Sequence, residues 1–205
     1  MSRQAISFFD EQFRSQGGAG EPELNPFERA ALPWLHGEVL DYGCGLGALA
    51  LAAARRGCRV RAMDGSAAAI DRLRARALAE GLAIDVVQAD LRGCRLAESF
   101  DAVVSIGLLM FFDCATAQRQ LGVLKEAVRP GGFAAINVLT QGTSFLDLFG
   151  GGERCLFAPG ELAAGFAGWE LLLDEDCEFS APQGTRKLFS TVIARRPAGG
   201  TSHGQ

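Results

Sequence analysis

From residue 37 onward, short apolar runs alternate with longer segments whose apolar residues recur at helical spacing. This alternation is typical of a doubly wound α/β fold, because parallel strands need long crossover connections that are usually helical. The run AVVSI at 102–106 has almost no polar alternation, which favours a central strand covered on both faces. The predicted strands lie near 37–42, 58–63, 84–89, 101–106, 132–139, 169–179 and 185–196. SAPQG joins the last two, which predicts an antiparallel hairpin at the edge of a mainly parallel sheet.

Capping residues mark the ends of two of the predicted helices. Ser66 is expected to cap a helix that ends at Gly81, and Asp113 to cap a second helix that stops at Pro130. Their inward-facing positions are predicted to be Ile70, Leu73 and Ala77 in the first helix and Leu121, Leu124 and Val128 in the second.

The chain of 205 residues is long enough to bury a sizeable core, and its length favours one main domain with small additions. Residues 1–36 are predicted to form an N-terminal helical cap. Residues 37–196 are predicted to form the main domain, and 197–205 a flexible tail.

Two segments have features of a cover over a binding site. Phe8, Phe9 and Phe13 cluster on the first helical pattern, which favours either a helix docked on the core or a cap that closes over a ligand. Residues 141–162 are glycine-rich and carry several exposed-looking phenylalanines, more than a plain connection needs. That segment is predicted to be a lid or a pocket wall.

Charge and hydropathy exclude several classes of partner. The 20 basic residues are spread along the chain beside 24 acidic ones, giving a net charge of −4, so the sequence offers no basic footprint for nucleic acid. No window approaches the roughly 20 apolar residues of a membrane span, and the N-terminus lacks the pattern of a signal peptide. A cytoplasmic protein with no membrane partner is therefore expected.

Cysteine and histidine are arranged in ways that argue against metal or nucleophilic chemistry. No CxxC pair occurs, so the six cysteines are interpreted as reduced and mostly buried, and no metal site is expected. The histidines are His36 and His203, and any Ser/His/Asp or Cys/His nucleophile would depend on His36. His36 is interpreted as a structural residue. The cysteines are Cys44, Cys58, Cys94, Cys114, Cys155 and Cys177.

The stretch VLDYGCGLGAL at 39–49 predicts a tight turn between a strand and a helix, where the missing side chains let a ligand approach the backbone. Asp64, at the end of the next strand, suits the two hydroxyls of a ribose. The glycines also satisfy the loose G-x-G-x-x-A pattern, so NAD is a rival ligand. Asp41 favours a ligand with an ammonium group over NAD, because its carboxylate would repel a pyrophosphate and attract that ammonium group.

The motifs together resemble those of class I S-adenosylmethionine-dependent methyltransferases. The resemblance covers about residues 35–196 and implies a Rossmann-like, seven-stranded, mainly parallel sheet with a reversed C-terminal hairpin. Within that superfamily the chain is similar to TehB-type tellurite-resistance methyltransferases, although such proteins often carry a His-Arg pair where this chain has only Arg186 and Lys187. The motifs are DYGCGLG (41–47), Asp64, QADL (88–91), FDAVVSI (100–106), FDAVVSIGLLMFF (100–112), VRPGGFAAINV (128–138) and PGGFAAINVLT (130–140).

The resemblance implies a cofactor site for S-adenosyl-L-methionine, with S-adenosyl-L-homocysteine as product. Asp41 would orient the amino group, Asp64 would bind the ribose, and Asp90 the adenine amine. Leu91 would contact the adenine ring, and Ser105 with Ile106 would face the methionine end. The glycines of the turn, Gly43, Gly45 and Gly47, would line the methionine part. The remaining residues assigned to the site are Tyr42, Cys44, Gly65 and Ser66.

The expected function is methyl transfer to a small molecule, with a chalcogen oxyanion such as tellurite and other small nucleophiles as the candidate acceptors. Alignment of the two partners suffices for a soft or anionic acceptor, so no general base is assigned. Arg186 is the one candidate for clamping an anionic substrate, with a solvated arginine as the alternative. Met110, Phe111 and Phe112 suit core packing better than an acceptor pocket. A monomer or homodimer is expected; a nicotinamide-dependent oxidoreductase and a non-catalytic binding protein stay as alternatives.

Overall fold

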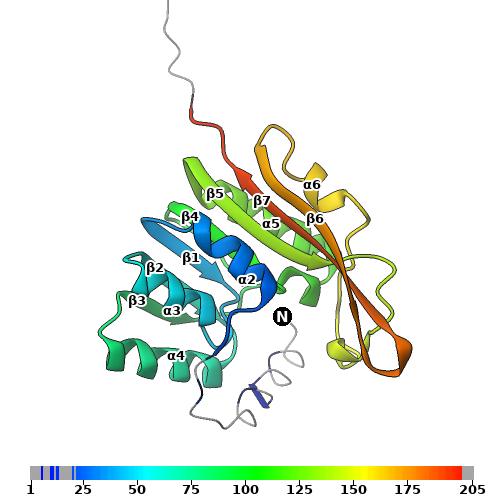
Figure 1. Cartoon of the computed structure of the whole chain (residues 1–205), viewed down its shortest axis with the longest axis horizontal. Coiled ribbons are helices and arrows are strands. Elements are labelled where there is room, and N and C mark those ends of the chain that lie inside the picture. The colour runs from blue at the N-terminus through cyan, green and yellow to red at the C-terminus, as the bar shows by residue number, and fades with distance from the viewer. Residues whose placement is uncertain (1–5, 7–9, 12, 14–19, 21, 200–205) are drawn as a thin grey trace, which may run out of the picture.

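A computed structural model describes residues 6, 10, 11, 13, 20 and 22–199 of the chain. Its centre is a seven-stranded sheet with the strand order β3-β2-β1-β4-β5-β7-β6 (Figure 1). The strands are β1 Glu38–Tyr42, β2 Arg59–Asp64, β3 Ile84–Gln88, β4 Phe100–Ile106, β5 Val128–Leu139, β6 Glu170–Ser180 and β7 Arg186–Arg195. The helices are α2 Pro26–Ala31, α3 Ala48–Arg55, α4 Ala67–Glu80, α5 Cys114–Ala127 and α6 Glu161–Ala164. Short 3-10 turns are η1 Leu32–Trp34, η2 Leu109–Phe111, η3 Asp147–Phe149 and η4 Pro182–Gly184.

The pairing of the strands confirms the predicted fold class. The first five strands pair in parallel, whereas β7 pairs antiparallel with both β5 and β6. The strand order reverses between β1 and β4, and ligands of open α/β sheets bind outside the carboxyl ends of the strands at such a point. The glycine-rich turn follows β1 at this position.

Each face of the sheet carries its own hydrophobic core, because successive side chains of a strand point to opposite faces. Val39, Val104 and Ala135 pack on the face covered by α2 and α3. Leu40 and Val103 pack on the opposite face with residues of α5 and α6. No helix among the described residues is both long and apolar enough to cross a lipid bilayer.

The two predicted helix caps are confirmed. Ser66 accepts a hydrogen bond of 3.2 Å from the Ala69 amide, and Gly81 ends α4 in the left-handed conformation. Asp113 accepts a bond of 2.9 Å from the Thr116 amide at the start of α5.

The predicted end of the second helix was wrong. The helix ends at Ala127, and Val128 and Pro130 already belong to β5. The pairing of β4 with β5 shifts register in this region, and a proline is tolerated where the ladder is interrupted because it has no amide to donate.

The cysteines differ from the prediction in one pair. Cys114 and Cys155 form a disulfide with a Cα–Cα distance of 4.7 Å, so the reading of all six as reduced was wrong. The two are 41 residues apart, and only the packing of residue 155 against the start of α5 brings them together. Of the remaining four, Cys44 and Cys58 are buried, whereas Cys94 and Cys177 are partly exposed.

Residues 141–162 pack against the α5 side of the sheet more closely than predicted. Phe149 and Phe157 are buried, so the expectation of several exposed phenylalanines was wrong. Phe157 forms a parallel bridge with Thr140, and the Phe149 ring lies 5.2 Å from the Phe111 ring. The buried residues of this segment therefore belong to the core on the α5 side of the sheet.

Candidate functional site

The turn after β1 has backbone conformations and close contacts that only glycine allows. Gly43, Gly45 and Gly47 have φ values of 87°, 51° and 79°, a region that side chains disfavour. A Cβ on Gly43 would lie 2.8 Å from the side chain of Leu108, and one on Gly47 would lie 2.4 Å from Leu73. The close approach of neighbouring elements therefore requires the missing side chains as much as any ligand does.

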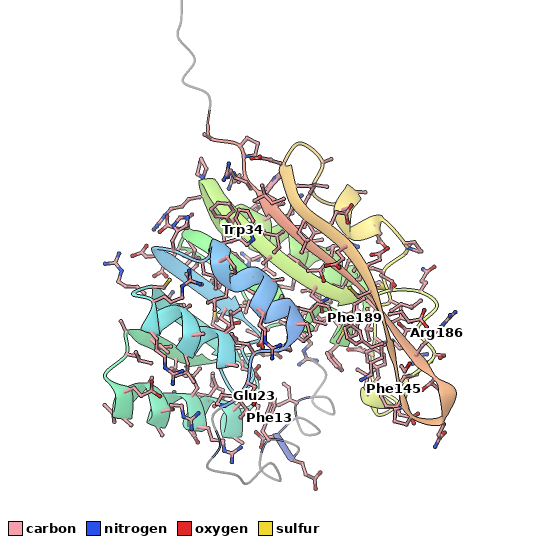
Figure 2. All side chains as sticks on the ribbon, in the orientation of Figure 1. Phe13, Glu23, Trp34, Phe145, Arg186 and Phe189 are labelled. Atoms are coloured by element: carbon pink, nitrogen blue, oxygen red, sulfur yellow. A yellow bond between two sulfur atoms is a disulfide. The ribbon has the colours of Figure 1, made fainter. Side chains whose placement is uncertain are left out.

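A cavity of about 370 Å³ opens at this turn. Its floor is residues 43–48, and its walls are Asp64, the end of β4 with residues 106–108, and Phe111. The N-terminal part of the chain closes it with Phe13 and four residues between 22 and 28. Figure 2 shows Phe13 and Glu23 beside each other at this end of the sheet.

Asp64 lies at the end of β2 and faces the glycine turn. Its carboxylate accepts hydrogen bonds of 2.9 Å from the Gly45 amide and 2.8 Å from the Ser66 amide. Burial raises the pKa of this carboxyl, while those backbone hydrogen bonds oppose the rise. A carboxylate has about four lone-pair sites, so two remain for a ligand hydroxyl.

Asp41 points from β1 toward α2 and α3. Its side chain is 5% exposed, and Oδ2 has no hydrogen-bond partner among the described residues. Burial raises the pKa of Asp41 to about 8, helped by the carboxylates of Glu28 and Asp64. A buried acceptor without a donor is unfavourable, so a cationic or donor group of a ligand would stabilise this site.

The side chain of Tyr42 points to the other face of the sheet. Its hydroxyl donates a hydrogen bond of 2.7 Å to the Leu91 carbonyl oxygen and lies 3.0 Å from Oε1 of Gln120. Leu91 is buried in the same core. Tyr42 and Leu91 therefore belong to the core behind the glycine turn, and their side chains do not line the cavity.

The other predicted site residues are divided between the cavity and its surroundings. Ile106 and Cys44 line it, and burial holds the pKa of the Cys44 thiol well above its usual range, so this group is a neutral thiol. Ser105 is fully buried, and its hydroxyl has no partner among the described residues. Ser66 caps α4. A Cβ on the neighbouring Gly65 would lie 3.2 Å from the side chain of Ile6.

Asp90 is half-exposed and outside the cavity lining. It forms an ion pair of 2.6 Å with Arg92, and the hydrogen bonds from that guanidinium lower its pKa to about 2. The pair would have to open for Asp90 to accept a bond from an adenine amine.

Arg186 lies at the start of β7, on the hairpin. Its guanidinium is half-exposed and lies 3.7 Å from the Glu178 carboxylate. Figure 2 shows Arg186 well away from Phe13 and Glu23. The structure therefore does not bring this predicted candidate to the cavity. His36 precedes β1, at the opposite end of that strand from the glycine turn, and its ring packs edge-on against Phe133.

Sequence reasoning missed the acidic residues of the N-terminal segment, Glu23 and Glu28. Asn25 and Glu28 form a capping box: the Glu28 amide donates to Asn25 Oδ1 at 2.9 Å, and the Asn25 amide donates to Glu28 Oε2 at 2.8 Å. The run NPFE carries the signature of such a box, and this was the available signal. Burial raises the pKa of Glu28, while the Asn25 amide and Arg29 oppose the rise.

The charges around the cavity decide which ligands it suits. Glu23, Glu28 and Asp64 line it, and none of its lining residues in the described part of the chain is a lysine or arginine. A pyrophosphate would face these carboxylates without a counter-charge, whereas a ligand with an ammonium group and ribose hydroxyls would not. No group of three or more histidine, cysteine or acidic residues within the described ranges is arranged to hold a metal ion.

Comparison with known proteins shows similarity to methyltransferases. A family model described as a methyltransferase domain matches residues 39–132, from β1 to the start of β5. The chain is 40% identical over 115 residues to a ubiquinone biosynthesis O-methyltransferase of Methylocella silvestris, which covers 54% of this chain and 44% of that protein. The chain spans between 30% and 55% of the length of the curated relatives it matches.

Two solved structures have the same fold. TehB from Haemophilus influenzae superposes with a TM-score of 0.75 at 22% identity, over 91% of this chain and 67% of that one. The N-methyltransferase NodS from Bradyrhizobium japonicum, solved with S-adenosyl-L-homocysteine, gives a TM-score of 0.68 at 18% identity, over 92% and 98%.

Proposed function

We propose that the chain, which has the fold of TehB and matches a methyltransferase domain model over residues 39–132, transfers a methyl group from S-adenosylmethionine to a small molecule. The observation that carries the proposal is the cavity at the glycine turn, which Asp64 lines. Asp41 lies outside that lining, and its buried Oδ2 has no donor among the described residues. Those residues suit the ammonium group and the ribose of that cofactor.

When bound, the cofactor supplies a methyl group on a sulfonium for in-line displacement by the acceptor. The work of the chain is then to hold and align both partners. Gly43, Gly45 and Gly47 let the cofactor lie against the backbone, Asp64 orients its ribose, and Ile106 with Phe111 forms an apolar wall. We propose that the N-terminal segment covers the site, because Phe13 and Glu28 already line it. Phe8 and Phe9, on which the predicted cap also rests, lie outside the described residues.

A tellurite-like oxyanion is the acceptor that the resemblance to TehB-type proteins suggests. No lysine or arginine among the described residues lines the cavity, and Arg186 lies apart from it, so a neutral or cationic acceptor fits better than an oxyanion. We therefore propose a neutral or cationic small-molecule nucleophile as the first choice and keep tellurite as a test substrate. A cytoplasmic location and a monomer or homodimer stay predictions.

Thermal-shift titration tests the cofactor. S-adenosylmethionine and S-adenosylhomocysteine should both raise the melting temperature, and NAD(H) should leave it unchanged. Stabilisation by NAD(H) alone would support the oxidoreductase alternative. Turnover is then tested by release of S-adenosylhomocysteine with a panel of amines, phenols, thiols, selenite and tellurite. If the cofactor binds but no acceptor leads to release of S-adenosylhomocysteine, the alternative of a non-catalytic binding protein would be favoured.

A further inference from the structure

We propose that Glu28, from the N-terminal segment, joins Asp41 in a clamp of two carboxylates that holds the α-ammonium group of the cofactor. The inference rests on the proposed function, because it assigns a partner to one group of S-adenosylmethionine. It adds to that function a residue from outside the glycine turn and the matched family domain, which begins at residue 39.

The buried oxygen of Asp41 is the first observation behind the clamp. Asp41 interacts with the Ala50 amide in the first turn of α3, yet Oδ2 has no partner among the described residues. The groups that act on this carboxyl are Glu28 from α2, Asp64 from β2 and the Ala50 amide from α3, with the Cys44 thiol next to it in the turn. Two of these four groups are carboxylates, so a cation close to Asp41 would be stabilised by several negative charges.

The position of Glu28 is the second observation. It lines the same cavity as the glycine turn, and its charge acts on Asp41. The capping box fixes its side chain through Oε2, which leaves the second carboxylate oxygen for a ligand. Glu28 is therefore held in place by local structure before a ligand binds.

The chemistry of the pair selects the ligand group. Asp41 is buried and Glu28 is partly buried, so their two carboxylates repel each other, and a cation between them removes that repulsion. An ammonium group has three donors and one positive charge, which matches two carboxylate acceptors. The cofactor carries its α-ammonium on the methionine part, the part that the glycine turn is proposed to bind.

The test compares two ligands that differ in the ammonium group. S-adenosylhomocysteine has it, and 5′-methylthioadenosine lacks the whole amino-acid part. Isothermal titration should show that Glu28→Gln weakens S-adenosylhomocysteine binding about 10- to 100-fold, as expected for a lost charged hydrogen bond. Binding of 5′-methylthioadenosine should change less than about twofold. Glutamine also completes a capping box, so α2 should keep its position.

Glu23→Gln is the matched control, because it removes one negative charge from the same cavity at an exposed position. It should change the affinity for S-adenosylhomocysteine less than about twofold, in line with the weak effect of solvent-exposed charges. Asp41→Asn should weaken the same ligand, and the double variant should lose less than the product of the two single losses, since both residues bind one group.

Three outcomes would overturn the clamp: equal losses for both ligands in Glu28→Gln, an unchanged affinity for S-adenosylhomocysteine, or loss of methyl transfer with binding intact. The last would assign Glu28 to the acceptor. A wild-type chain that binds none of the adenosyl ligands would instead refute the proposed function.

Discussion

The Gly45 amide donates a hydrogen bond of 2.9 Å to the Asp64 carboxylate and so joins the turn after β1 to the end of β2. The Gly43 amide makes a second connection, a bond of 2.8 Å to the Met63 carbonyl oxygen. The glycine turn is thus held in place by the neighbouring strand, and with it the proposed cofactor site.

Replacing Asp64 by alanine should weaken S-adenosylhomocysteine binding by about 1–3 kcal/mol if the carboxylate holds the ribose. Stability should fall as well, because the Gly45 and Ser66 amides lose their acceptor. Isothermal titration and chemical unfolding measure the two effects separately. An unchanged affinity in a folded variant would exclude Asp64 from the cofactor site.

Gly43→Ala should abolish or strongly reduce cofactor binding and lower stability by more than about 1 kcal/mol, because φ is 87° and the new Cβ would meet Leu108 at 2.8 Å. Gly57→Ala is the matched control: its φ is 90°, but nothing lies within 4 Å of the added Cβ. Equal effects of the two on binding would show that close packing at the turn is unimportant.

Tyr42→Phe should lower the free energy of unfolding by about 1–2 kcal/mol, because the buried Leu91 carbonyl loses its donor. Its affinity for S-adenosylhomocysteine should stay within about twofold of the wild type, since the side chain faces away from the cavity. Urea unfolding and titration calorimetry provide the two numbers. A selective loss of affinity would return Tyr42 to the cofactor site.

The raised pKa of Asp41 predicts how stability depends on pH. The folded state holds a proton on Asp41 between its ordinary pKa of 3.8 and about 8, whereas the unfolded state does not. Stability relative to Asp41→Asn should therefore fall as the pH rises through this range, by up to about 1.4 kcal/mol per pH unit. Denaturant unfolding of both variants at several pH values measures the difference, and parallel curves would contradict the assignment.

The same carboxyl predicts a pH dependence of binding. An ammonium ligand binds the charged form of Asp41, so affinity for S-adenosylhomocysteine should rise between about pH 6 and 8, with a proton released on binding. Titration calorimetry in buffers of different ionisation enthalpy detects that proton. 5′-Methylthioadenosine, which has no ammonium group, should release none.

The disulfide between Cys114 and Cys155 predicts four titratable thiols in denatured, unreduced protein and six after reduction, since the chain has six cysteines. Reduction should lower the free energy of unfolding by about 2–4 kcal/mol, because the closed loop of the unfolded chain is released. Cys114→Ser should show a similar loss and no further response to reductant. Six thiols before reduction would refute the bond.

The order of elements was predictable because strand and helix periodicity is local, as Ser66, Gly81 and Asp113 show at the ends of helices. The Cys114–Cys155 bond was not, since it depends on how residues 141–162 pack. The placement of Asp64 beside the glycine turn was predictable because both lie at the carboxyl ends of adjacent strands of the sheet. Glu28 was missed because it reaches the cavity through the packing of α2, which sequence spacing does not encode.

The position of β7 has a consequence for how the chain reaches its fold. β7 follows β6 in the sequence but lies between β5 and β6 in the sheet, so β6 has no partner until residues 186–195 are in place. A nascent chain that lacks those residues would expose the edge of β5 and an unpaired β6, and such edges recruit other chains. We therefore expect aggregation during synthesis or refolding to increase when this last strand inserts slowly.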